Sequence, residues 1–315
     1  MTKKKIVVVG ARGYVGKELL PLLETHEQLE VKAVGSRMLA GESVKKHIQK
    51  YKGSLSFSSL TPEALSQSDA DLVFLALPNG ESPKYLKLLQ QAKNPMKVID
   101  LSADHRFDPN WQYGLVEHQM NNIKNKQLIS NPGCYATGAQ MAIRPFLPYV
   151  QGTPSIFGVS GFSGAGTTRS PKNDPEVLYE NILPYALSDH IHEKEIGYHL
   201  DNPVRFMPHV TFFFRGIMLT INIPVKEKVG AIEAYNLCRA FYADHPLIHV
   251  QETPPWVRDN VSKHHLCIGG FKSNEAGDAL CVVATLDNLL KGAATQALQN
   301  LNLAFGWEAN TGIPQ

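Results

Sequence analysis

The sequence predicts an α/β protein: a doubly wound domain with a parallel sheet, followed by an α+β domain with a mostly antiparallel sheet. Two observations carry this prediction. Short β-branched runs alternate with helical stretches in the first half of the chain, and longer strand-like runs dominate after Pro148. The chain has 315 residues, of which 43% are hydrophobic and 19% are charged, which suits two domains of ordinary size.

The first half alternates strand and helix. An apolar run at 5–10 precedes a leucine-rich helical stretch at 14–26, and 29–36 is again strand-like, which makes a βαβ unit. Further strands are expected at 70–78, 97–102 and 127–130, with a helix at 82–93. These segments together predict a first domain over residues 1–148.

Residues 149–287 are expected to form the second domain. Its longer strands are expected at 155–161, 207–214 and 216–225, with a helix at about 229–243. The apolar strands could supply an interface between subunits, but the core of the domain is the favoured use. The last helical stretch, 288–305, is expected to pack back on the first domain.

Composition favours a small-molecule partner. The formal net charge is only +2, from 31 Lys and Arg against 29 Asp and Glu, so no strong field attracts nucleic acid or an anionic membrane. The opening "MTKKKIVVVG" has neither a cleavage site nor enough apolar length for a membrane span, and a cytoplasmic location is expected. The four cysteines lack paired spacing, so free thiols are expected in a reducing compartment.

A glycine-rich turn follows the first predicted strand. Gly10, Gly13 and Gly16 stand in GxxGxxG spacing before the first helix, where glycines allow a tight turn and close approach of a pyrophosphate to the helix N-terminus. The context predicts a Rossmann-like dinucleotide site. Ser36 and Arg37 end the second strand where an NAD site usually has a carboxylate, so the sequence favours NADP; a solvated loop arginine is the alternative.

Cys134 is the candidate nucleophile. It follows a Pro-Gly pair and begins a helical run, and the N-terminus of a helix stabilises a thiolate. Inert packing is the default for a cysteine, and it suits Cys238 in an amphipathic helix and Cys267 and Cys281 in strand-like runs.

The densest histidine cluster, "SDHIHEKEIGYHL" at 188–200, is the candidate source of a base. His190 and His192 are two residues apart, so they can serve one site only if the segment is extended or begins a helix. No third ligand nearby completes a metal site, and no metal is expected. Four further histidines are expected to be surface or hydrogen-bonded structural residues: His209, His249, His264 and His265.

Several long blocks carry a specific resemblance. They include "GARGYVG", "FLALPNG", "DLSADHR", "NPGCYATGAQ", "GFSGAG", "HIHEKEI", "PHVTFFFRGIMLT" and "DNLLKGAATQALQNLN". In this order the chain resembles the N-acetyl-γ-glutamyl-phosphate reductase family of arginine biosynthesis, which is similar in design to aspartate-semialdehyde dehydrogenase. The resemblance covers nearly the whole chain. It departs at His105, Ile191 and Lys194, where the family usually has Phe, Arg and Pro.

The resemblance implies a role for each candidate residue. Cys134 would be the nucleophile, His192 the acid/base and His190 its neighbour. The cofactor NADP(H) would contact Gly10, Arg12, Gly13, Tyr14, Val15, Gly16, Ser36, Arg37, Pro78, Ser163, Gly164 and Asn288. Arg106 would hold the substrate phosphate, and Ser102, Asn131, Glu195 and Arg215 would complete the substrate site.

The implied reaction is NADPH-dependent reductive dephosphorylation of N-acetyl-γ-glutamyl phosphate through a cysteine thioester, in a dimer or tetramer. The alternative within the class is a carrier-linked aminoadipyl phosphate or aspartyl phosphate as substrate. A cysteine hydrolase would need no glycine turn, and a protein that only binds a nucleotide would need no activated thiol with a facing histidine.

Overall fold

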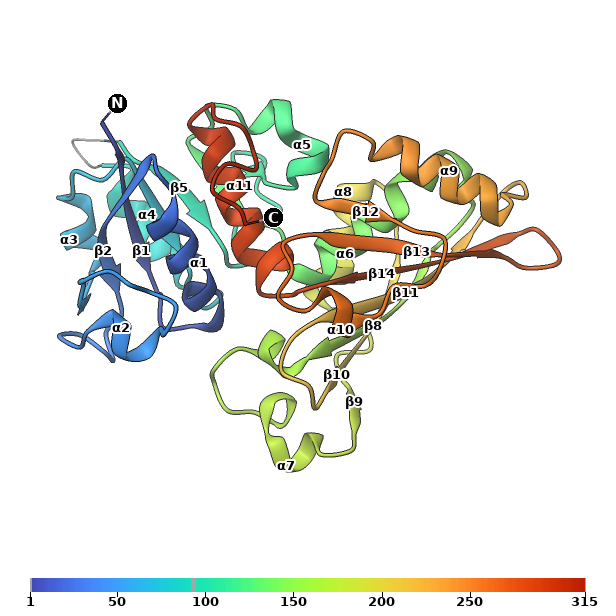
Figure 1. Ribbon diagram of the computed structural model, residues 1–315, viewed down its shortest axis with the longest axis horizontal. Helices are drawn as coiled ribbons and strands as arrows, with labels where there is room; N and C mark the ends of the chain where they lie inside the picture. Colours follow the sequence, from blue (N-terminus) through green and yellow to red (C-terminus); the bar gives the residue numbers. More distant parts are fainter. Residues whose placement is uncertain (1, 92–94, 315) are drawn as a thin grey trace. The chain divides into compact units, whose positions relative to one another are not determined.

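The structure is a computed structural model in which residues 2–91 and 95–314 are described (Figure 1). Its contacts divide the chain into two compact units, Met1–Pro132 with Ala293–Gln315, and Gly133–Gly292. Residue 148, where the sequence places the division, lies inside the second unit. The reason is helix α6 (Cys134–Ile143), which packs on strands β11 (Ile217–Pro224) and β14 (Ala279–Leu286) of that unit.

The first unit holds a seven-stranded sheet in the order β3-β2-β1-β4-β5-β7-β6, and all its paired neighbours are parallel. Its strands are β1 (Lys4–Val9), β2 (Leu29–Gly35), β3 (Phe57–Ser58), β4 (Leu72–Leu75), β5 (Lys97–Asp100), β6 (Gln112–Tyr113) and β7 (Leu128–Ser130). From β1 the chain adds β2 and then β3 on one side of the sheet. It then crosses to β4 on the other side of β1, where β5, β7 and β6 follow. This confirms the doubly wound fold and puts its switch point between β1 and β4.

The strands and helices of this sheet follow the hydrophobic pattern. All four residues of β4 are fully buried, as is usual for a parallel strand covered on both faces. The helices of the unit are α1 (Tyr14–Thr25), α2 (Val44–His47), α3 (Pro62–Ser66), α4 (Ser82–Leu89), α5 (Val116–Ile123) and α11 (Thr295–Ala304). The helix expected at 82–93 ends at Leu89, and residues 92–94 lie outside the described residues.

Helix α11 is the last helix of the first unit, and its contacts account for the polar residues in its sequence. It packs on α1, α5 and β5, and its asparagines are buried. Asn300 Nδ2 donates to the Gly114 oxygen at 3.0 Å, and Asn302 Nδ2 donates to the Ala309 and Thr311 oxygens at 2.9 and 2.8 Å. Because buried amides need partners, these contacts account for asparagines in a helix that has no exposed face.

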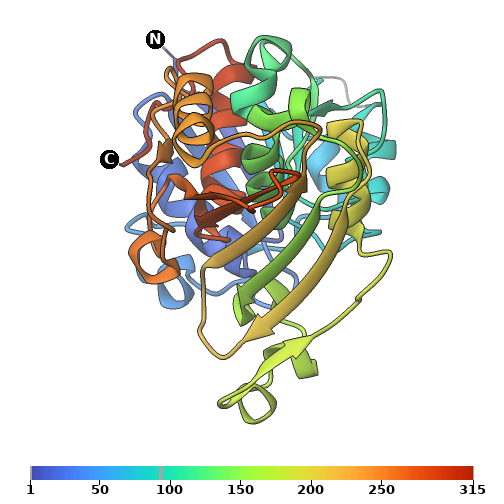
Figure 2. The same cartoon turned by 90° about the vertical axis from the view of Figure 1, so that its right-hand side faces the viewer.

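The second unit holds a seven-stranded sheet in the order β12-β13-β14-β11-β8-β10-β9 (Figure 2). The remaining strands are β8 (Ser155–Gly161), β9 (Ile182–Pro184), β10 (Arg205–Thr211), β12 (Ile248–Val250) and β13 (Leu266–Ser273). Only the β8–β10 and β12–β13 pairs are parallel, so the predicted mostly antiparallel sheet is confirmed.

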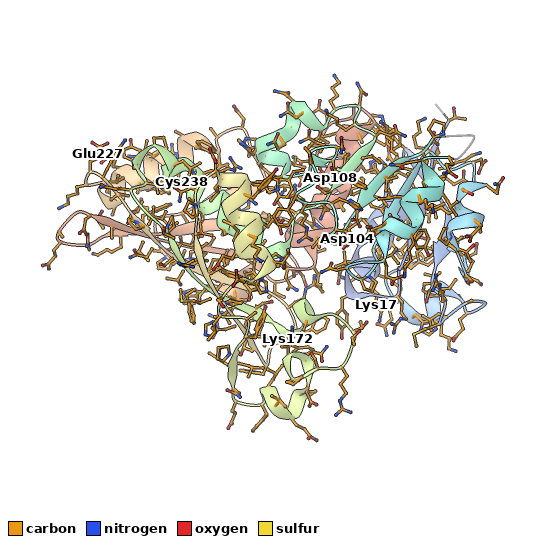
Figure 3. All side chains as sticks on the ribbon, turned by 180° about the vertical axis from the view of Figure 1, so that it is seen from behind. Lys17, Asp104, Asp108, Lys172, Glu227 and Cys238 are labelled. Carbon is orange, nitrogen blue, oxygen red and sulfur yellow. The ribbon has the colours of Figure 1, made fainter. Side chains whose placement is uncertain are left out.

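Helices α8 (Ile191–Leu200), α9 (Ala231–Phe241) and α10 (Val257–Asn260) complete the second unit with α6 and the short α7 (Pro175–Leu178). Residues 135–143 of α6 are all buried, and at Gly138 a Cβ would lie 2.7 Å from Leu219 Cδ1. The small residues of "YATGAQMAI" therefore let α6 lie close against the sheet. Cys238, labelled in Figure 3, is buried in α9. Among the described residues, no helix combines the length and apolar character that crossing a bilayer requires.

Candidate active site

Cys134 is the first residue of α6 and is only partly buried. The N-cap, Gly133, offers no side-chain hydrogen bond to the helix, and the first turn carries no acidic residue. The N–H groups at this end are left without intrahelical partners, and the positive end of the helix dipole lies at the sulfur. A thiolate at Cys134 is therefore stabilised by its backbone surroundings.

Two contacts fix the start of α6. The Gly133 N–H donates to Glu195 Oε1 at 2.8 Å, and Glu195, on α8, is fully buried. On the other side, a Cβ built on Gly292 would lie 2.7 Å from Cys134 Cβ, so only glycine fits there without a shift. The sequence analysis places Glu195 among the substrate contacts, and in the structure its carboxylate accepts a hydrogen bond from the backbone of the cysteine turn.

His190 and His192 lie together at the start of α8. His190 is the N-cap, its Nδ1 accepts from the His192 N–H at 3.1 Å, and the two ring centroids are 5.0 Å apart. The condition for both histidines to serve one site, an extended segment or the start of a helix, is met. The edge of the Tyr135 ring meets His192 at 5.7 Å between centroids, which links the histidine pair to the residue after Cys134.

Aromatic side chains pack around the histidine pair. Tyr135 packs edge-on against Phe206, and Tyr185 packs edge-on against His190. Burial raises the pKa of Tyr135 well above its usual value, with smaller contributions from Tyr185 and Cys134. Burial, followed by the charge of Cys134, raises the pKa of Tyr185. Both tyrosines are therefore neutral at the site and can act as hydrogen-bond donors.

Lys172 gives His190 a positively charged neighbour. Its Nζ lies 4.9 Å from the centre of the Tyr185 ring, and the residue is labelled in Figure 3. Burial and then the charge of Lys172 lower the pKa of His190 to about 4, against a smaller opposing effect of Glu195. His190 is therefore neutral at physiological pH.

Ser163 and Asn288, both expected beside the cofactor, are in direct contact. Asn288 Nδ2 donates to Ser163 Oγ at 2.9 Å, and Asn288 Oδ1 accepts from the Gly216 N–H at 2.8 Å. At Gly164 a Cβ would lie 2.8 Å from Ser160 Oγ. One side-chain hydrogen bond, from Asn288 to Ser163, thus ties the turn "GFSGAG" to the segment that follows β14.

Arg215 is held by an ion pair that the sequence analysis missed. Its Nη2 donates to Asp287 Oδ1 at 2.9 Å and its Nε donates to Asp287 Oδ2, so the pair is bidentate. Asp287 is fully buried and also accepts from the backbone of Ser262 at 2.7 Å. The pairing Ile217↔Leu286 between β11 and β14 brings these two residues together, a relation that strand register alone supplies.

In the first unit, the glycine turn has the geometry that a pyrophosphate requires. Gly10 has φ +82°, and a Cβ there would lie 2.2 Å from the Ala76 oxygen. Gly13 caps α1 and has nothing within 3.4 Å of its Cβ position, while Gly16 lies against the Ala11 backbone. The α1 N-terminus has neither a side-chain cap nor an acidic first turn, so it is suited to an anion.

The other predicted cofactor contacts of the first unit surround this turn or follow nearby strands. Arg12, Tyr14 and Val15 are partly exposed, Pro78 is exposed after β4, Ser36 is buried after β2, and Arg37 is exposed beside it. The donor set therefore fits a dinucleotide: backbone N–H groups for the pyrophosphate, and a hydroxyl with a guanidinium at the end of β2.

Ser102, Arg106 and Asn131 lie beyond the carboxyl ends of β5 and β7. Arg106 is nearly buried, with Nε donating to the Asn131 oxygen at 3.1 Å and Nη2 to the Leu101 oxygen at 3.2 Å. Ser102 Oγ donates to Asp100 Oδ2 at 2.7 Å, and Asn131 Oδ1 accepts from Asn300 at 3.0 Å. His105, the departure next to Arg106, stacks on Trp111 at 4.2 Å between centroids.

Comparison with known proteins identifies the family. Two family models match: the semialdehyde dehydrogenase NAD binding domain over residues 5–126, and the semialdehyde dehydrogenase dimerisation domain over 134–288. An N-acetyl-γ-glutamyl-phosphate reductase of Xanthomonas axonopodis pv. citri is 48% identical over 305 residues, which are 97% of this chain and 96% of that protein. The chain belongs to the N-acetyl-γ-glutamyl-phosphate reductase family.

Another relative is much longer than this chain. The protein "arg11, mitochondrial" of Schizosaccharomyces pombe is 49% identical over 311 residues, which cover 98% of this chain but 35% of that protein. The chain therefore spans about a third of that relative's length.

Solved structures support the fold. Aspartate semialdehyde dehydrogenase II of Vibrio cholerae, in a complex with ASA, matches with a TM-score of 0.79 at 17% identity, over 96% of this chain and 98% of that one. The enzyme of Francisella tularensis matches with a TM-score of 0.76, also at 17% identity, over 95% and 99%. The reductase-family chain therefore shares the semialdehyde dehydrogenase fold.

Sequence reasoning missed the residues that surround the predicted ones. Tyr135 stands inside the quoted cysteine block, and Asp287 stands beside Asn288, so both had a positional signal. Gly292 stands inside the quoted block "DNLLKGAATQALQNLN" and had such a signal too. Tyr185 and Lys172 had none, because only the tertiary structure brings them near His190.

Proposed function

We propose that the chain catalyses the NADPH-dependent reductive dephosphorylation of N-acetyl-γ-glutamyl phosphate to N-acetylglutamate semialdehyde in arginine biosynthesis. The reductase-family relatives that align over nearly the whole chain support this activity. The observation that carries the chemistry is Cys134 at the uncapped N-terminus of α6, linked through Tyr135 to the His190–His192 pair.

Cys134 performs the covalent step. Its thiolate attacks the acyl carbonyl of the substrate, a C–S bond forms, and the C–O bond to phosphate breaks so that phosphate leaves with the electron pair. The product is a thioester on Cys134. The helix N-terminus supports this step by keeping the sulfur anionic before attack.

His192 donates a proton and then takes it back in the second half-reaction. NADPH supplies a hydride to the thioester carbonyl carbon when it is bound. His192 protonates the oxyanion that results on the acyl oxygen, and takes the proton back as the carbonyl re-forms and the C–S bond breaks. The semialdehyde leaves and Cys134 returns to the thiolate.

His190 is a positioning residue rather than the acid/base. Its Nδ1 accepts the His192 N–H, and its depressed pKa keeps the ring neutral near pH 7. A neutral acceptor at the N-cap fixes the first turn of α8, on which His192 stands. The residue assigned to proton transfer is therefore His192.

The cofactor and substrate contacts follow from the donor sets described above. The glycine turn holds the pyrophosphate, and Ser36 with Arg37 holds the 2′-phosphate. Ser163, Gly164 and Asn288 lie at the nicotinamide side. Arg106 binds the substrate phosphate, with its guanidinium oriented by two main-chain carbonyls.

We also propose a homo-oligomer, a dimer or tetramer, and a cytoplasmic location. The match to a family model described as a dimerisation domain supports assembly through the second unit. In that unit Ile217, Leu219 and Ile221 of β11 are fully buried, but Phe212 is 61% exposed and Phe214 40%. These phenylalanines offer the apolar surface that an interface requires, and light scattering of the purified chain measures the mass.

The reverse reaction tests the proposed activity. Purified protein is given phosphate and either N-acetylglutamate semialdehyde or aspartate semialdehyde, and NADP reduction is followed by absorbance. The acetylated substrate should be used with the higher kcat/KM, and omission of phosphate should stop the reaction. Preference for aspartate semialdehyde would replace the proposed substrate by aspartyl phosphate.

A further inference from the structure

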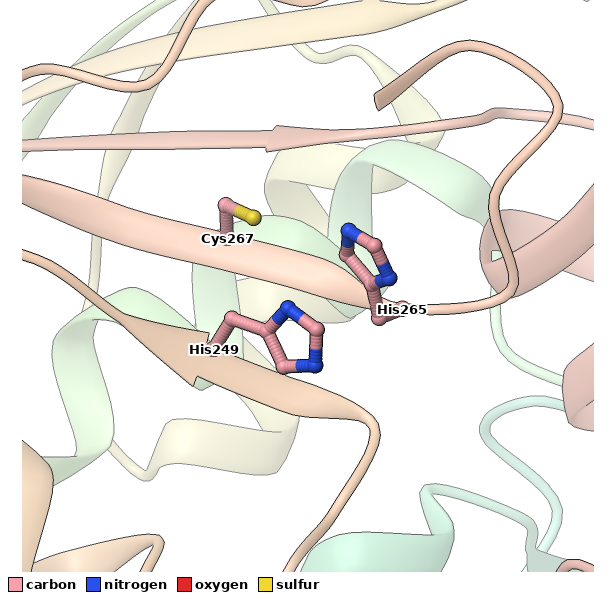
Figure 4. A group of neighbouring side chains, drawn as sticks. All are labelled: His249, His265 and Cys267. Carbon is pink, nitrogen blue, oxygen red and sulfur yellow. The ribbon is translucent and has the colours of Figure 1, made fainter. Parts of the chain in front are cut away.

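Three potential metal ligands meet at one edge of the second unit's sheet (Figure 4). They are His249, His265 and Cys267, and one ligand atom of each lies within 4.8 Å of the others. We refer to these three residues as the His-Cys cluster. None of them belongs to the proposed catalytic chemistry.

Strand pairing creates the His-Cys cluster. His249 is the central residue of β12 and is paired in register with Cys267 on the parallel strand β13. His265 lies directly before β13, two positions from Cys267, and both side chains contact Asn260 Oδ1. The rings of His249 and His265 stack at 3.9 Å between centroids. Backbone geometry, rather than a mobile loop, therefore brings the ligands together.

A buried asparagine orients two of the three side chains. Asn260 Oδ1 accepts from His265 Nε2 at 3.0 Å and from Cys267 Sγ at 2.9 Å. Its Nδ2 donates to Thr285 Oγ1 at 2.7 Å and to the Trp256 oxygen at 3.1 Å, so the amide cannot rotate. Metal-bound histidines usually donate their second ring N–H to such an acceptor. Because Nε2 carries the proton, Nδ1 of His265 holds the lone pair.

We propose that the His-Cys cluster binds one zinc-class divalent transition-metal ion. Two imidazoles and one thiolate form a ligand set that zinc accepts in tetrahedral geometry, with ligand bonds of about 2.0–2.3 Å. One ligand atom of each side chain lies within 4.8 Å of the others, so the side chains must rotate slightly toward one another to reach these bond lengths around one ion. The exposed His249 faces solvent, so the ion has a route of entry and a water can take the fourth position.

Binding has a defined proton balance. The Cys267 thiol loses its proton to solvent as the sulfur–metal bond forms, and the hydrogen bond from Sγ to Asn260 is lost with it. The two imidazoles bind as neutral ligands and keep their second N–H. One proton is thus released per metal ion bound at a pH where both histidines are neutral.

The bound ion would hold β12 to β13 and to the segment around α10. Asn260 contacts Thr285 of β14, and two residues later the Ser262 N–H donates to Asp287, the partner of Arg215. The metal would therefore support the segment that buries Asp287. Its direct effect is on stability rather than on the chemical step.

Direct metal titration tests the proposal, in a Cys134→Ser background that removes the competing active-site thiol. Purified full-length chain is titrated with Zn²⁺ against a chromophoric chelator, and with Co²⁺ for its thiolate charge-transfer absorption. One metal per chain is expected, with cobalt absorption typical of a thiolate ligand. His249→Ala and Cys267→Ser should each weaken binding by roughly 10- to 100-fold or more, and Cys267→Ser should remove the charge-transfer band.

Two control variants make the result specific. Cys281→Ser changes a cysteine in the neighbouring strand β14, and His264→Ala changes the histidine next to His265; both should bind metal like the Cys134→Ser parent. His249 is exposed, so its variant stays informative even if loss of buried Cys267 unfolds the chain. Absence of stoichiometric binding in the parent, or equal affinity in the parent and the His249→Ala variant, would overturn the proposal.

Discussion

At the scale of single residues, the four cysteines differ by their surroundings. Burial raises the pKa of Cys238 to about 12 and that of Cys267 to about 11, where the hydrogen bond to Asn260 only partly opposes it. Burial also raises the pKa of Cys281. These three thiols are protonated at neutral pH and react slowly. Cys134 alone stands at a helix N-terminus among the four.

Alkylation should therefore select Cys134. At pH 7, limiting iodoacetamide is expected to label this residue first, as read by peptide mass spectrometry. Cys134→Ser should abolish that label and lower turnover by roughly 10³-fold or more, because the covalent step has no substitute nucleophile. NADP affinity should stay at the wild-type level. Turnover close to wild type would remove Cys134 from the mechanism.

His190 should titrate far below the ordinary histidine value of 6.5, at about 4, because of burial and Lys172. Between these values the unfolded chain binds more protons than the folded one. His190 therefore makes the chain less stable as pH falls from 6.5 to about 4, and has no such effect above 6.5.

NMR titration of the His190 ring measures this pKa directly. Lys172→Ala removes the second cause of the shift and should raise the His190 pKa toward 6.5, without reaching it. Lys84→Ala changes an exposed lysine of the other unit and should leave it unchanged. An identical His190 pKa in the wild type and the Lys172→Ala variant would show that burial alone produces the shift.

At the scale of elements, the start of α6 depends on partners far away in sequence. The run at 134–143 predicts a helix that begins at Cys134, and the structure has that helix. Gly133 and its acceptor Glu195 are separated by 62 positions in the sequence. Gly292, which contacts Cys134, lies in the segment after β14. Periodicity reports local structure, so it predicted the helix but could not predict its neighbours.

Gly292→Ala tests the close contact with the nucleophile. The added Cβ would lie 2.7 Å from Cys134 Cβ, so the start of α6 must move and the sulfur with it. Turnover should fall by roughly 10- to 100-fold, since displacements of about 1 Å have effects of that size. Gly230→Ala is the matched control, because nothing lies within 4 Å of its Cβ position. Equal kcat values for the two variants would contradict the role given to Gly292.

Two substitutions of Glu195 test its hydrogen bond with the Gly133 N–H. Glu195→Gln keeps an acceptor oxygen for the Gly133 N–H, whereas Glu195→Ala removes it inside the core. The alanine variant should lose about 1–3 kcal/mol more of the free energy of unfolding than the glutamine variant. Urea denaturation measures the difference, and equal losses would mean that the Gly133 contact contributes little.

At the scale of the whole molecule, the alternation of strands and helices predicted the first sheet, and the longer strand-like runs after Pro148 predicted the second. The sequence predicted those parts of the candidate site that depend on residues adjacent in the chain, such as the turn at Gly10 and the helix start at Cys134. The sequence did not predict contacts that depend on how strands pair, such as the ion pair between Asp287 and Arg215 at the ends of β14 and β11. The His-Cys cluster shows the same limit. His249 and Cys267 are separated by a loop and a helix in the sequence, and only the β12–β13 pairing makes them neighbours.

The proposed function gives each unit its own part of the chemistry, and this division can be tested. Arg37→Ala should weaken NADP binding by about tenfold or more, because a charged hydrogen bond to the 2′-phosphate is lost, and should leave NAD binding unchanged. Alkylation of Cys134 without cofactor should proceed at the wild-type rate. Equal affinities for NAD and NADP in the wild type would refute the assignment of Arg37 to the 2′-phosphate.

The return of α11 to the first unit has a consequence for synthesis of the chain. Asn300 donates to the Gly114 oxygen across 186 positions, so the first unit lacks part of its core until the ribosome has translated α11. The second unit is one uninterrupted segment, Gly133–Gly292, and is complete earlier. We therefore expect the second unit to fold before the first during translation, although folding usually proceeds from the N-terminus.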